Sequence, residues 1–126
     1  MMYNIDQIFE LLSWNNSLED QKKGIEKAKK INDLSVLIMP FKRKCIWENC
    51  AKVLVEKSDR ELTPYFPLLF KWLQDMNWPG AYLIFDRLQE VSNNDIVSAY
   101  NDSLLLAINT EDHVWEKVLH DFKKRK

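Results

Sequence analysis

The sequence is 126 residues long, which is enough for one domain built around one hydrophobic core. It is 46% hydrophobic but has only two glycines and four prolines, fewer than a sheet protein with tight turns needs. The net charge is −1, and no run of about 18 apolar residues is present, which excludes a membrane-spanning helix. The N-terminal stretch MMYNIDQIFELL lacks the features of a secretory signal, so we expect a cytoplasmic protein.

Helical spacing of apolar residues recurs along the whole chain. The first helix is expected to follow Asn4 and the second to follow Ser17, since both residue types cap helix N-termini. Asp33 is expected to cap a short helical segment. A longer helix is predicted over residues 42–57.

The central helix is expected to follow a turn over residues 59–62. Thr63 would cap it, and Pro64 would take the first helical position, where a missing N–H costs no helical hydrogen bond. The sequence YFPLLFKWLQDM is apolar on nearly every side, which places this helix in the centre of the fold. The core residues predicted for this helix and the next are Phe66, Leu69, Phe70, Leu73, Ile84, Phe85 and Leu88.

Three further helices complete the prediction. Asn77 would cap the first, with Pro79 in its first turn, Asn94 would cap the second, and the last would begin at about Glu111. The last two helices are expected to bury Val97, Tyr100, Leu104, Ile108, Trp115, Val118, Leu119 and Phe122. The sequence therefore predicts an all-α single domain of about seven helices over residues 1–126, with a basic tail at 122–126.

Three tryptophans indicate a weak internal repeat. Trp47, Trp78 and Trp115 each begin the second helix of a predicted pair, at spacings of 31 and 37 residues. Periods of this order are typical of stacked helical hairpins, in which each pair buries its apolar face against its neighbours. We therefore expect a HEAT-like stack of antiparallel helix pairs.

The segment from Trp47 to Leu88 carries two distinctive stretches, KSD-x-x-L and WLQDMNWPGA. It resembles a family of uncharacterised bacterial proteins marked by these two features. The resemblance covers about a third of the chain and implies a HEAT-like helical fold. It implies no established activity, so no catalytic residue is carried over from it.

Charge is distributed unevenly along the chain. Residues 1–60 carry +2, residues 61–122 carry −7, and the last four residues add +4. Such asymmetry can steer a partner over long range, and tryptophan beside polar groups is typical of binding surfaces. The predicted binding residues are Asp75, Asn77, Trp78, Asp86, Glu90, Asp95 and Asp102. The alternative is that these carboxylates are scattered surface charges and WLQDMNWPGA is a structural corner between two helices.

Other polar clusters have simpler interpretations. His113 and His120, with a glutamate between them, can share one helix face, but a solvated polar stripe is the expected outcome. Cys45 and Cys50 are expected to be reduced thiols, because on a helix they point about 140° apart. The basic residues 42–44 could hold an anion at the start of a helix. The alternative interpretation is that they form a solvated basic turn.

The sequence predicts a non-catalytic, protein-binding helical-repeat module with a basic partner, for example an immunity-type protein. No P-loop, GxGxxG, HExxH, GxSxG or EF-hand pattern is present, and no metal or cofactor is implied. A nucleic-acid-binding HEAT-like protein is the first alternative, although the acidic larger half argues against a long phosphate track. An enzyme without a recognisable motif is the second. The identity of the partner does not follow from the sequence.

Overall fold

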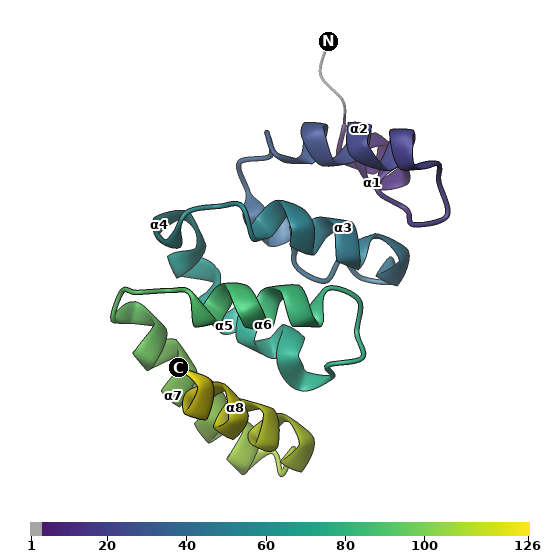
Figure 1. The fold of residues 1–126 in the computed structure, drawn as a ribbon. Coiled ribbons are helices and arrows are strands. Elements are labelled where there is room, and N and C mark those ends of the chain that lie inside the picture. The colour runs from purple at the N-terminus through teal and green to yellow at the C-terminus, as the bar shows by residue number, and fades with distance from the viewer. Residues whose placement is uncertain (1–3) are drawn as a thin grey trace.

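The computed structural model describes residues 4–126, which are helical and contain no strand (Figure 1). Residues 1–3 of the predicted domain lie outside the described part. The α-helices are α1 (Ile5–Leu11), α2 (Leu18–Ala28), α3 (Lys44–Leu54), α4 (Asp59–Leu62), α5 (Phe66–Lys71), α6 (Ala81–Gln89), α7 (Asp95–Asn109) and α8 (His113–Arg125). Three short 3₁₀ turns are η1 (Leu34–Leu37), η2 (Thr63–Tyr65) and η3 (Trp72–Gln74). α4, η2, α5 and η3 follow one another without a break over residues 59–74. If this run counts as one bent helix and the short turn η1 is not counted, the described residues form the seven helices expected.

The helices follow one another along a stack in chain order (Figure 1). α2 packs on α3, α3 on α6, and α6 on α8, so these second helices of successive pairs form one layer. In the other layer α5 packs on α7, and α7 also pairs with α8 at the C-terminal end of the stack. No helix among residues 4–126 is both long and apolar enough to cross a membrane.

Side-chain caps start several helices where the sequence predicts them. Asn4 forms a capping box with Gln7, which satisfies N–H groups that have no partner inside the helix. Ser58 forms a second capping box, with Glu61, and starts α4 where the sequence predicts only a turn over residues 59–62. Ser17 accepts from the N–H of Asp20 at 3.1 Å, and Asp33 accepts from the N–H of Ser35 at the start of η1. Local sequence is therefore enough to fix the three predicted helix starts.

Two helix boundaries in the first half of the chain differ from the prediction. α3 begins at Lys44 rather than at 42, because Lys42 adopts the left-handed region with φ 60°. Thr63 does not cap the central helix. Its hydroxyl instead donates to the carbonyl oxygen of Asp59 at 2.7 Å, and α5 proper begins only at Phe66. The two prolines around this point supply no N–H, which explains the intervening 3₁₀ turn.

The starts of the last two helices agree with the prediction only in part. Asn94 occupies the N-cap position of α7 but has helical backbone angles, and its side chain makes no capping hydrogen bond. α8 begins at His113 rather than at Glu111, which has a left-handed φ of 55°. Asp112 is the residue that caps it, by accepting from the N–H of Trp115 at 3.0 Å.

The core forms around α5 and α6, as the sequence predicts. All seven predicted core residues of these helices and η3 are at most 5% exposed. Trp115, Leu119 and Phe122 of α8 complete this core, and the indole N–H of Trp115 donates to the carbonyl oxygen of Phe70 at 3.0 Å. Phe122 contacts the rings of Phe70 and Phe85 edge-on. The central helix therefore joins both layers of the stack.

The buried side of α7 is not the predicted one. Val97 and Ile108 are 54% and 47% exposed, and Leu104 is only partly buried. Tyr100 is buried as predicted, with its ring against both Phe70 of α5 and Phe122 of α8. The remaining buried residues of the helix are Ile96, Ala99, Ser103 and Ala107. α7 thus turns a side with several small residues toward the core and leaves larger apolar residues exposed.

Candidate functional site

The WLQDMNWPGA segment forms a tight corner between η3 and α6. A carboxylate oxygen of Asp75 accepts from the N–H of Asn77 at 2.8 Å, and the indole N–H of Trp72 donates to the carbonyl oxygen of Pro79 at 2.9 Å. Asn77 therefore lies in the turn and does not cap α6, contrary to the prediction. Pro79 precedes the helix, and Gly80 occupies the N-cap position.

Gly80 attaches the corner to α3. Its φ of +85° favours glycine, and a Cβ atom at this position would lie 2.7 Å from the Cβ of Ala51. Its N–H donates to a carboxylate oxygen of Glu48 at 2.8 Å. These contacts hold the corner against α3 of the neighbouring helix pair.

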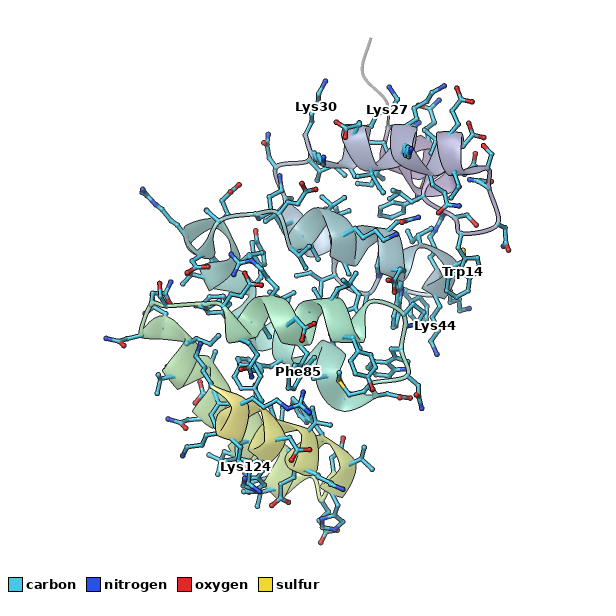
Figure 2. The ribbon with its side chains drawn as sticks, viewed as in Figure 1. Trp14, Lys27, Lys30, Lys44, Phe85 and Lys124 are labelled. Carbon is cyan, nitrogen blue, oxygen red and sulfur yellow. The ribbon has the colours of Figure 1, made fainter. Side chains whose placement is uncertain are left out.

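Three tryptophans and a lysine meet beside this corner. The Trp47 ring contacts the rings of Trp72 and Trp78 edge-on, with centroids 6.1 and 5.7 Å apart. The Lys44 ammonium lies 5.8 Å from the Trp47 ring and 5.9 Å from the Trp78 ring. Figure 2 shows Lys44 at the edge of the stack, on the same edge as Trp14. Trp78 is only partly buried, so it is both a wedge in the corner and part of the surface.

A hollow of about 400 Å³ lies against the corner. Asn77 and Trp78, two of the predicted site residues, line it, together with Glu48, Met76, Tyr82 and Leu83. Tyr82 is 68% exposed and was not among the predicted site residues. The signal that could have found it is its spacing, four residues after Trp78 and four before Asp86.

Four residues at intervals of four positions define what we call the α6 row: Trp78, Tyr82, Asp86 and Glu90. Residues spaced in this way lie along one side of a helix. Tyr82, Asp86 and Glu90 are exposed, and Trp78 stands just before the helix begins. The row therefore places two aromatic rings at one end of α6 and two carboxylates toward the other.

The carboxylates of the row form no ion pair. Within residues 4–126 the side chains of Asp86 and Glu90 have no cation at ion-pair distance and no hydrogen-bond partner. The Lys126 ammonium lies beside Glu90 but donates to the carbonyl oxygens of Gln89 and Val91. Arg87, the cation next in sequence, turns inward and donates to Asp59 at 2.7 Å and to the carbonyl oxygens of Val55 and Lys57. The one cation of α6 is thus neutralised inside the fold.

The remaining predicted acids do not join this row. Asp75 lies at the corner, at the opposite end of α6 from Glu90. Asp95 and Asp102 are exposed on α7, which packs in the other layer of the stack. The structure therefore brings together Asp75, Asn77 and Trp78, and separately aligns Asp86 with Glu90.

The other polar clusters lie at the surface or are engaged. His113 and His120 of α8 both face the carboxylate of Glu116, at 3.9 and 3.4 Å, and no group of three metal-ligating side chains occurs in residues 4–126. Cys50 is fully buried, which raises the pKa of its thiol to about 12 and keeps it protonated. Arg43 pairs with Asp6 at 3.6 Å.

A comparison with known proteins gives one match. A family model described as Domain of unknown function (DUF5071) matches residues 47–125, which is more than half of the chain. No curated protein and no solved structure matches the chain. The matched range includes the corner, the α6 row and the α7–α8 pair.

Proposed function

We propose that this chain, which belongs to the DUF5071 family, is a non-catalytic, protein-binding module with a HEAT-like stack. It docks a basic partner on the α6 row. The description of the family names no activity, so the proposal rests on the geometry of the chain. The observation that carries this proposal is the row itself. Its exposed carboxylates form no ion pair, and two aromatic residues that line one hollow lie at the start of the same helix.

The chemistry of the row matches a basic protein segment. Tyrosine and tryptophan supply the large, rigid contact area that dominates the affinity of many interfaces. Unpaired surface carboxylates attract lysine and arginine over long range and fix the orientation of docking. From Tyr82 to Glu90 the row is about 12 Å long, at 1.5 Å per helical residue. It suits a segment with an apolar side chain at one end and cations at the other.

One concrete form of this function is an immunity-type protein that neutralises a cationic toxin. Nucleic-acid binding receives less support, because part of the basic surface is already paired. Lys29 contacts Glu26 and Glu56 at 3.0 and 3.4 Å, and Arg43 contacts Asp6. A phosphate track would need these cations to be available.

Photo-crosslinking tests the proposal directly. p-Benzoylphenylalanine at position 82 is irradiated in an extract of the cells that naturally contain the protein, and the products are identified by mass spectrometry. The same residue at Leu68, which is exposed on α5 in the other layer, is the matched control. We expect a basic protein to be captured from position 82 alone, with less capture when Asp86 and Glu90 are both lysine. Equal capture from both positions, or an acidic product, contradicts the proposal.

A further inference from the structure

An apolar stripe is left open at the C-terminal end of the stack. On α7, Val97, Leu105 and Ile108 are 54%, 58% and 47% exposed, and Leu104 beside them is partly buried. At about 100° per helical residue these side chains fall within a sector of roughly 100°, which also contains the exposed amide side chain of Asn101. Leu106 points about 180° away from Val97 and does not belong to the stripe. Figure 1 shows the α7–α8 pair as the last layer of the stack.

Such a stripe is a candidate contact surface. In a helical stack each helix pair buries its apolar face against its neighbours. Several exposed apolar residues gathered on one side of a helix are typical of an interaction surface. The stripe therefore needs a covering partner, and the charges around it identify which one.

The two ends of the α7–α8 pair carry opposite charge. The end with the turn between the helices holds three carboxylates, Glu111 and Asp112 in the turn and Glu116 in the first turn of α8, beside one lysine, Lys117. The opposite end holds four basic residues, Lys123 to Lys126, and two acidic residues, Asp95 and Asp121. Of the four, Arg125 and Lys126 contact α6 and the residue after Glu90, so Lys123 and Lys124 are the cations available to a partner. A hollow of about 250 Å³ is lined by Val97, Asn101, Lys123 and Lys126, so the basic tail adjoins the Val97 end of the stripe.

We propose that a second copy of this chain covers the stripe, with its α7 antiparallel to the first around a two-fold axis near the middle of the helix. This arrangement places Val97 of one copy beside Ile108 of the other, and Leu104 of one copy beside Asn101 of the other, so that the two ends of the stripe cover each other. It also brings the acidic turn of each copy to the basic tail of the other. A two-fold contact is self-complementary in this way, because each pairing occurs twice. None of the stripe residues belongs to the α6 row, so the dimer and the proposed docking of a partner are independent.

Sedimentation equilibrium of the full chain over a range of concentrations tests the covered stripe. The wild type is expected to be a dimer. Leu105→Glu should raise the dimer dissociation constant about a hundredfold or more, because it buries an unpaired carboxylate. Leu106→Glu is the matched control on the opposite side of α7, and it should remain dimeric. Circular dichroism verifies that both variants fold. A monomeric wild type, or equal effects of the two substitutions, overturns the proposal.

Charge reversal tests the antiparallel arrangement. Reversing Lys123 and Lys124 to glutamate gives a chain with two acidic ends, and reversing Glu111 and Glu116 to lysine gives a chain with two basic ends. Each variant alone should be a weaker dimer, whereas an equimolar mixture should form a heterodimer close to wild-type stability. Sedimentation of the mixture measures this recovery. If the mixture is no more dimeric than its components, the antiparallel two-fold arrangement is wrong.

Discussion

Replacing Gly80 by alanine tests how the corner fixes the start of α6. A non-glycine residue at a left-handed φ costs roughly 1–2 kcal/mol. The new Cβ would also lie 2.7 Å from the Cβ of Ala51 and 3.0 Å from a ring carbon of Trp72. Overpacking of this kind costs about 1–3 kcal/mol. Gly80→Ala should therefore lower the free energy of unfolding by about 2–5 kcal/mol, as measured by urea unfolding with circular dichroism.

A second substitution separates the two contributions. Ala51→Gly removes the nearest methyl group and by itself costs about 1 kcal/mol of helix propensity. In the Gly80→Ala background it should instead recover part of the lost stability, because the steric contact is removed while the backbone strain remains. A loss below about 0.5 kcal/mol for Gly80→Ala alone would refute both the contact and the strain.

Four further substitutions test the core and its charges. Leu69→Ala and Phe85→Ala should each cost about 2–5 kcal/mol, since both side chains are almost fully buried, and losses below about 0.5 kcal/mol at both would mean different packing. Hydrogen bonds from Arg87 and from the Ser92 N–H lower the pKa of Asp59. Asp59 therefore adds stability above its unfolded-state pKa, and that stability is lost as pH falls through the folded-state value. Asp59→Asn should lower stability at neutral pH and flatten its acid dependence in a urea series; an unchanged dependence would contradict the pairing. Trp115→Phe should cost about 1–3 kcal/mol, because it removes the buried hydrogen bond from the indole N–H to the carbonyl oxygen of Phe70 and shrinks a fully buried ring; an unchanged unfolding midpoint would contradict this.

The sequence predicts those parts of the fold that depend on local chemistry. The side-chain caps at Asn4, Ser17 and Asp33 are confirmed, because each cap needs only residues within three positions. The core around α5 and α6 is also confirmed, because a segment that is apolar on nearly every side has no alternative orientation.

The orientation of α7 could not be predicted in the same way. Its sequence offers two apolar sides, and the periodic template fits the side with larger residues, which includes Val97 and Ile108. The structure buries the side that carries Ala99, Ser103 and Ala107. Which side is buried depends on helices distant in sequence, such as α5, and on whether another surface covers the larger residues.

The candidate site was predictable only in part. Asn77 and Trp78 stand out in the sequence as members of an unusual motif, and both line the hollow at the corner. Tyr82 belongs to no motif. It can be recognised as a site residue only from its spacing of four residues from Trp78 and from Asp86. The unpaired state of Asp86 depends on Arg87, whose side chain turns toward residues about 30 positions earlier in the chain. No local pattern carries that information.

The most direct test of the proposed function is the association rate of the partner captured from position 82, measured by stopped-flow at low and high salt. With wild-type protein the rate should fall as salt rises, because exposed charges are screened within about 10 Å at 0.1 M. Asp86→Lys with Glu90→Lys should slow association at low salt while leaving the unfolding midpoint nearly unchanged. Reversing Glu10 and Glu19, exposed on the first helix pair, makes the same change in net charge and should have a smaller effect. An association rate indifferent to salt and to reversal of the α6 row would contradict the account, and would make the basic residues 42–44 the next surface to test.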